Sequence, residues 1–112
     1  MREAINANMR DKARFNVSLK ARYRIKQQGM QDQECQLTNL SASGGLVLLP
    51  RTVSLSRGAD IFMNIPIPRT VMHVSAEAEI MWVKQRFSRL RTGIKFKSQL
   101  SDTMIQRLVK KD

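Results

Sequence analysis

The sequence predicts a mostly β fold, a small six-stranded antiparallel barrel or sandwich that is followed by a C-terminal α-helix. Three observations support this prediction. Apolar and polar residues alternate with period two in several segments. Turn residues separate these segments at short intervals, and the apolar spacing becomes helical only near the end of the chain. With 112 residues the chain has the size of a single domain.

The clearest strand is predicted at residues 15–26, where apolar side chains alternate with polar ones without interruption. A strand with one buried and one wet face produces this pattern. The further strands that we expect, each bounded by turn or charged residues, lie at residues 33–40, 46–49, 61–67, 72–82 and 90–96. Within residues 72–82, Ala78, Ile80 and Trp82 fall on one apolar face, and this spacing predicts that Trp82 packs in the core.

The change to helical spacing begins after Ser101. The apolar residues that share one helical face are Met104, Ile105, Leu108 and Val109. Ser101 is a good N-cap residue, and Asp102 suits the positive end of the helix dipole. We therefore expect a terminal helix that packs on the strands.

The start of the chain has no periodic apolar pattern through residue 13. We expect residues 1–13 to form a flexible arm and residues 14–112 to form the barrel domain with its helix. The arm lacks the apolar core of a secretory signal, and no apolar run reaches the length of about 18 residues that a membrane-spanning helix requires. A cytoplasmic location is therefore predicted.

The charge of the chain is strongly positive, with 20 Lys and Arg against 9 Asp and Glu and a net charge of +11. This balance favours an anionic partner such as nucleic acid, a nucleotide, phosphate or a membrane surface. Cys35 is the only cysteine, so neither an internal disulfide nor a cysteine-rich zinc site is expected. We expect no metal and no cofactor.

Catalytic patterns are not evident in the sequence. His73 is the only histidine, and no Ser or Cys pattern accompanies it to suggest a nucleophilic triad. Glu77 and Glu79 share one strand face, where solvated charges are expected. The sequence therefore predicts a binding protein and not an enzyme.

Two short motifs suggest what is bound. Arg10 and Arg14 lie four residues apart just before the first strand, a spacing that so basic a chain produces roughly once by chance. Asn39, Ser41 and Gly44 form an (Asp/Asn)-x-Ser-x-x-Gly pattern where a strand runs into a turn. The composition predicts only about 0.03 such matches by chance, so the second motif carries most of the specificity.

In this order and placement, the two motifs resemble those of the PilZ domain family, and the resemblance extends over roughly residues 9–109. It implies a six-stranded antiparallel barrel that binds the second messenger cyclic di-GMP. The ligand-binding residues that it implies are Arg10, Arg14, Asn39, Ser41 and Gly44. Trp82 resembles a position that can flank the guanine in this family, which is the alternative to its place in the core.

The chemistry of these residues suits the implied ligand. The arginine fork matches the N7 and O6 acceptors of guanine, and it can also stack on a base or pair with phosphate. Asn39 offers an amide to the guanine edge, with less strength than Asp would give, and Ser41 offers a hydroxyl donor. We expect Gly44 to have a positive φ and to permit close approach of the backbone.

The function predicted is that of a stand-alone cyclic di-GMP receptor. Ordering of the arm by the ligand would change the interaction with a partner protein, in signalling of the motility, biofilm or virulence type that the family implies. One alternative is a basic barrel that binds RNA or single-stranded DNA, which the low aromatic content of 5% disfavours. Another is a PilZ-like adaptor without ligand, which the two intact motifs disfavour. The partner, the ligand stoichiometry and the oligomeric state are left open.

Overall fold

The computed structural model of the protein describes residues 14–26, 32–50 and 55–109. The strands are β1 (Phe15–Ile25), β2 (Gln33–Leu40), β3 (Gly44–Pro50), β4 (Asp60–Pro66), β5 (His73–Arg86) and β6 (Arg89–Phe96), and the helix is α2 (Asp102–Val109). The predicted arm, residues 1–13, lies outside the described residues, and Arg10 lies there with it.

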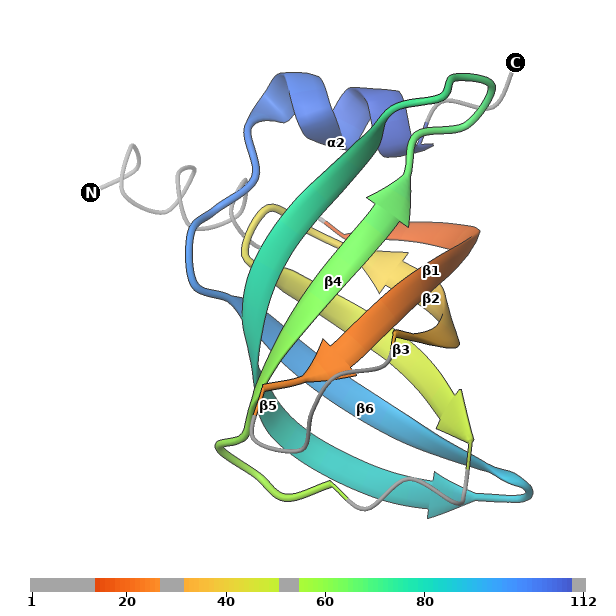
Figure 1. The fold of residues 1–112 in the computed structure, drawn as a ribbon, viewed down its shortest axis with the longest axis vertical. Helices are drawn as coiled ribbons and strands as arrows, with labels where there is room; N and C mark the ends of the chain where they lie inside the picture. The colour runs from red at the N-terminus through yellow and green to blue at the C-terminus, as the bar shows by residue number, and fades with distance from the viewer. Residues whose placement is uncertain (1–13, 27–31, 51–54, 110–112) are drawn as a thin grey trace.

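The six strands form one closed antiparallel barrel in the order β1-β2-β3-β6-β5-β4 (Figure 1). The sheet closes because β1 pairs with β2 along one side and with β4 along the other. Closure removes the unpaired edges that an open sheet of this size would expose. The predicted fold class is confirmed, and of the two arrangements left open by the sequence the chain adopts the barrel.

The core of the barrel consists of the inward side chains of all six strands. Its fully buried large members are Tyr23, Leu37, Leu40, Val47, Leu49, Ile61, Met63, Ile65 and Ile80. Each such side chain contributes about 1.5–3 kcal/mol by leaving water. Cys35 is also buried, and desolvation raises the pKa of its thiol to about 12. It is therefore a packing residue with an unreactive, protonated sulfur.

Helix α2 covers one end of the barrel (Figure 1). Ser101 is its N-cap, as predicted, because its Oγ accepts a hydrogen bond of 3.2 Å from the backbone N–H of Met104. Ile105 and Leu108 are buried against the strands. Within the described residues, no helix is long and apolar enough to cross a bilayer.

Two strand boundaries differ from the prediction by more than one residue. β3 begins at Gly44, two residues early, because Gly44 and Gly45 pair with Lys95 and Ile94 of β6. β5 continues past Trp82 to Arg86, so the residues expected to form a polar tip are paired with β6 up to a two-residue turn. Backbone pairing does not require an apolar face, and strands that are polar on both sides therefore escape detection by alternation.

Irregularities in the register occur in β1, β2 and β5. In β2 the register shifts between Leu37 and Asn39, so that Leu37 and Leu40 are both buried while Asn39 faces outward. In β5 it shifts between Ile80 and Trp82, so that Ile80 is fully buried and Trp82 is 40% exposed. Of the two places left open for Trp82, the core beside Ile80 is therefore excluded, because a bulge reverses which side of the sheet the following residues face.

Candidate ligand-binding site

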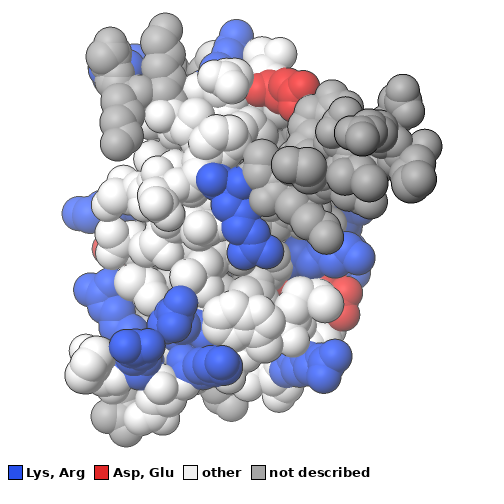
Figure 2. Space-filling view, turned by 180° about the vertical axis from the view of Figure 1, so that it is seen from behind, with Lys and Arg blue, Asp and Glu red and all other residues white. Residues whose placement is uncertain are grey.

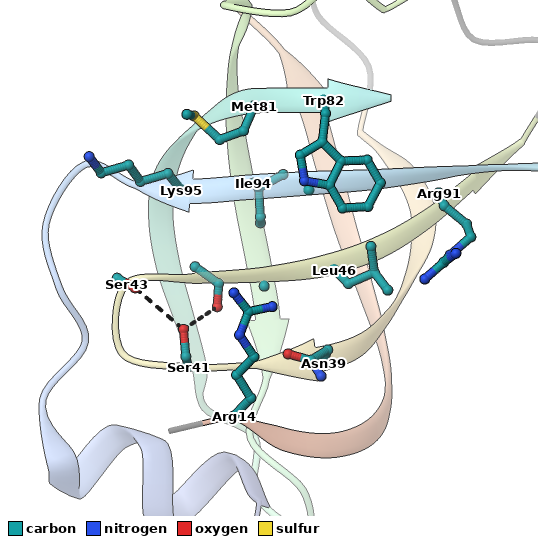
Figure 3. Close-up of a pocket in the computed structure, with 13 residues that line it drawn as sticks. Arg14, Asn39, Ser41, Ser43, Leu46, Met81, Trp82, Arg91, Ile94 and Lys95 are labelled. Carbon is teal, nitrogen blue, oxygen red and sulfur yellow. Dashed lines mark hydrogen bonds between the residues drawn. The ribbon is translucent and has the colours of Figure 1, made fainter. Parts of the chain in front are cut away.

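A hollow of about 420 Å³ lies on the outer face of the barrel, over β2, β3, β5 and β6 (Figure 3). The residues predicted to bind ligand that line it are Arg14, Asn39, Ser41, Gly44 and Trp82. Segments far apart in the sequence thus contribute to one surface. Its described lining includes the cations Arg91 and Lys95 and contains no acidic residue, so its electrostatic potential favours an anion.

Arg14 immediately precedes β1 and is exposed. Its guanidinium extends into the hollow and lies between Ser41 and Asn39 (Figure 3). Because the group is charged and presents several donors in one plane, it can bind phosphate or the edge of a guanine there. Its predicted companion, Arg10, lies outside the described residues.

The turn between β2 and β3 is held by Ser41, whose side chain is buried with a residue exposure of 6%. Its backbone N–H donates to the carbonyl of Gly44 at 2.8 Å. Its hydroxyl donates to the same carbonyl at 3.3 Å and lies 3.4 Å from the Oγ of Ser43. The hydroxyl that the sequence suggested as a donor to ligand is thus engaged in the turn, which it fixes in place.

Gly44 does not have the positive φ that the sequence suggested. Among the described glycines only Gly58 has one. A Cβ at Gly44 would instead overlap the carbonyl oxygen of Ile94 on the neighbouring strand β6. Glycine is therefore required because two backbones approach closely where the turn joins the barrel.

The same turn is also bound from its other side. The carbonyl of Ser43 accepts from the N–H of Phe96 at 2.7 Å, and that of Ala42 accepts from the N–H of Leu100 at 2.9 Å. These bonds join the turn to the end of β6 and to the segment that leads into α2. The turn therefore forms a preorganised wall of the hollow.

Asn39 faces the hollow because of the bulge in β2. Its Oδ1 is buried and has no hydrogen-bond partner among the described residues. A buried acceptor without a partner costs about 1–3 kcal/mol, so folded proteins rarely retain one without a reason. An N–H group of a ligand would satisfy it once a small movement of the side chain exposes the oxygen to the hollow.

Trp82 reaches the hollow through the bulge in β5 and lies over Gly93 of β6 (Figure 3). A Cβ at Gly93 would overlap the indole, so the absent side chain is what allows the ring to lie against the strand. The ammonium of Lys84 lies 5.8 Å from the ring centroid. The indole is thus a supported, partly exposed platform on which a planar base can stack.

The sequence prediction did not include Arg91 and Lys95 as residues of this hollow. Both are outward-facing members of β6, where they alternate with the buried Leu90, Thr92, Ile94 and Phe96. That alternation could have identified them as outward cations. It could not have indicated that this part of β6 lies beside the β2–β3 turn, which depends on the strand order.

Comparisons with known proteins agree with this architecture. The family model for the PilZ domain matches residues 8–111. The search of curated proteins gave no match. The PilZ domain of YcgR from Escherichia coli, whose structure is described as containing c-di-GMP, is similar with a TM-score of 0.66 and 16% identity, over 87% of this chain and 86% of that one.

Two further solved structures share the fold. The inhibitor of motility MotI/DgrA from Bacillus subtilis aligns with a TM-score of 0.67 and 15% identity, over 85% of this chain. This chain spans about half the length of that protein, 46%. The PilZ domain of CeSA from a cellulose-synthesizing bacterium aligns with a TM-score of 0.56 and 16% identity, over 85% of this chain and 87% of that one.

The fold and the site together define a class of protein, a small closed antiparallel barrel with a cationic hollow beside the β2–β3 turn. The family model covers nearly the whole sequence. The chain belongs to the PilZ domain family, as the two motifs had indicated.

Proposed function

We propose that this PilZ domain is a receptor for cyclic di-GMP and binds it in the hollow over β2, β3, β5 and β6. The observation that carries the proposal is the convergence in one hollow of a guanidinium, a supported indole and an amide oxygen that has no partner among the described residues. These groups belong to Arg14, Asn39 and Trp82. They are the kinds of group that recognise a phosphate, the edge of a guanine and the face of a base.

Each residue has a distinct role in this proposal. Arg14 binds a phosphate or the N7 and O6 edge of a guanine, and Arg10 adds a second guanidinium from the arm. The Oδ1 of Asn39 accepts from a guanine N–H group, and Trp82 stacks on a guanine face. Ser41 and Gly44 contribute by holding the turn, whose internal hydrogen bonds already exist without ligand.

The consequence of binding is a change in the surface around the hollow. We propose that the arm, residues 1–13, becomes ordered over the ligand and alters the contact with a partner protein. In this proposal the domain acts as a receptor without catalysis and without a cofactor, at a cytoplasmic location. Signalling of the motility, biofilm or virulence type is part of the same proposal.

Isothermal titration calorimetry of the purified chain with cyclic di-GMP tests the proposal. Wild-type protein is expected to bind, and Arg14→Ala is expected to weaken binding by roughly 10- to 150-fold, because a hydrogen bond to a charged group contributes about 1.5–3 kcal/mol. Arg107→Ala removes an exposed cation from α2 and is the matched control, with an expected change below about twofold. Cyclic di-AMP, which has the same charge without the guanine edge, should bind far more weakly.

Two results would overturn the proposal. One is the absence of both binding heat and NMR shifts when cyclic di-GMP is added at tens of micromolar. The other is an equal loss of affinity in Arg14→Ala and Arg107→Ala, which would attribute binding to the net charge alone. Steep salt dependence with any single-stranded RNA or DNA, and no preference for cyclic di-GMP, would favour the nucleic-acid alternative.

A further inference from the structure

The apex of the β5–β6 hairpin holds an aromatic side chain in water. The two-residue turn consists of Phe87 and Ser88, and Phe87 is 87% exposed. Its φ is 55°, in the left-handed region, at the first position of a two-residue hairpin loop. Glycine is preferred at such a position, and a bulky residue there is strained. The isolated domain therefore gains nothing evident from a phenylalanine here.

The cations on either side of this aromatic ring pair with one another across the hairpin, which destabilises the folded state. Lys84 pairs across the hairpin with Arg91, and Arg86 pairs with Arg89, so like charges are opposed twice in succession. Cross-strand pairs of like charge destabilise a sheet. The sequence between positions 82 and 91 contains no acidic residue that could relieve the repulsion.

The contacts that the structure shows for these cations are to neutral groups, and Glu34, which lines a second hollow together with Ser88 and Arg89, forms no ion pair with them among the described residues. Arg89 donates to the Oε1 of Gln36 at 3.2 Å, and the guanidinium of Arg86 lies 5.8 Å from the Phe87 ring centroid. Within the part of the chain that the structure describes, none of the four cations forms an ion pair with a carboxylate. Figure 2 shows basic side chains gathered at the lower left, at the end of the barrel where the hairpin lies, with no acidic side chain among them.

We propose that this hairpin docks the protein on an anionic membrane surface. Phe87 inserts at the boundary between headgroups and acyl chains, and Lys84, Arg86, Arg89 and Arg91 contact the lipid phosphates. An apolar ring surrounded by cations is the arrangement that binds this boundary, because each component meets the layer of the bilayer that it prefers. Arg91 also lines the ligand-binding hollow and Lys84 lies over the Trp82 ring, so the tests below use Phe87, Arg86 and Arg89, which do not line it.

The shape of the hairpin favours a membrane over an acidic protein. The apex extends only two residues past the last β3 pair, Pro50 with Arg89, and its apolar part is one ring. A specific protein interface typically needs about 800 Å² from each partner, with a well-packed apolar centre. A fluid lipid surface needs no complementary shape, so a narrow apex is sufficient for it.

Vesicle co-sedimentation of the full chain tests the proposal. The two vesicle types are pure phosphatidylcholine and equal parts of phosphatidylcholine and phosphatidylglycerol. Wild-type protein is expected to sediment with the anionic vesicles and to remain in solution with the neutral ones. No sedimentation with the anionic vesicles would overturn the proposal.

Phe87→Gly tests insertion of the ring without threatening the fold, because glycine relieves the strained φ. Thermal unfolding should show a melting temperature no lower than that of wild type, while affinity for the anionic vesicles falls by about tenfold. Val71→Ser is the matched control, since Val71 is fully exposed in the β4–β5 loop at the other end of the barrel. Equal vesicle affinity in wild type and Phe87→Gly would overturn the proposal.

The charges are tested in the same way. The double variant Arg86→Gln/Arg89→Gln should lose roughly fivefold affinity for each cation removed. The matched double variant Arg69→Gln/Arg107→Gln removes the same charge near α2 and should change affinity little. Equal losses of vesicle affinity in the two double variants would overturn membrane docking. Binding to soluble polyglutamate that is equally tight and equally dependent on Phe87 would also overturn it, and would identify an acidic protein as the partner.

Discussion

The unpaired oxygen of Asn39 yields a prediction in which stability and binding change in opposite directions. Asn39→Leu keeps nearly the same side-chain shape and removes a buried acceptor that has no partner among the described residues. Removing an unsatisfied group recovers up to its desolvation cost of about 1–3 kcal/mol. Asn39 is only partly buried, so we expect the free protein to gain about 1 kcal/mol, or about 4 °C in melting temperature.

The same substitution is expected to weaken cyclic di-GMP binding by roughly 5- to 150-fold, because it leaves a guanine N–H group without its acceptor at a cost of about 1–3 kcal/mol. Urea unfolding measures the change in stability, and calorimetric titration measures the change in affinity. Asn39→Asp is the informative companion. It keeps the acceptor and adds charge, so binding should tighten by about tenfold.

Two outcomes would refute this reasoning. A less stable Asn39→Leu protein would mean that the amide contributes to the fold through a partner outside the described residues. Unchanged affinity in Asn39→Leu would mean that the oxygen does not meet the ligand. The combination of higher stability and lower affinity would identify Asn39 as a position where the free protein gives up stability for binding.

Three further predictions concern other parts of the barrel. Gly93→Ala should displace the indole of Trp82 and so shift its fluorescence. Because a base is proposed to stack on this indole, ligand binding should weaken by roughly 5- to 150-fold. Unchanged fluorescence would contradict the packing described. Gly44→Ala should lower the free energy of unfolding by about 1–3 kcal/mol in urea, since its Cβ meets the backbone of β6, and an unchanged midpoint would contradict this. Burial raises the pKa of Cys35 from 9.0 and that of Tyr23 from 10.0, each to about 12. Between about pH 9 and 12 the native state therefore retains protons that the unfolded state loses. The free energy of unfolding should fall as the pH rises through this range. Cys35→Ala should make that decline shallower in urea midpoints measured against pH, and an identical slope would refute the assignment.

The sequence predicted the elements of the barrel well because alternation is a local signal. Residues 15–26 alternate so regularly that β1 (Phe15–Ile25) could be read directly. The N-cap at Ser101 is another local feature, which depends on a side chain and a backbone N–H three residues away. The motif from Asn39 to Gly44 likewise identified the turn that forms one wall of the site.

The positions of two site residues could be decided only by the tertiary structure. Alternation placed Trp82 with Ile80 in the core, whereas a bulge in β5 turns it outward onto Gly93. A bulge in β2 turns Asn39 outward toward the same hollow. A bulge adds one residue to one strand of a pair, so its place depends on the register against neighbours that are distant in the sequence.

The two-part motif therefore determined which residues belong together, and the barrel determined how they meet. Local residue types specify strands, turns and caps because those depend on neighbours within a few positions. The strand order, which brings Arg91 and Lys95 of β6 beside the β2–β3 turn, depends on pairing between segments about fifty residues apart. Only closure of the barrel turns these separate signals into one cationic hollow.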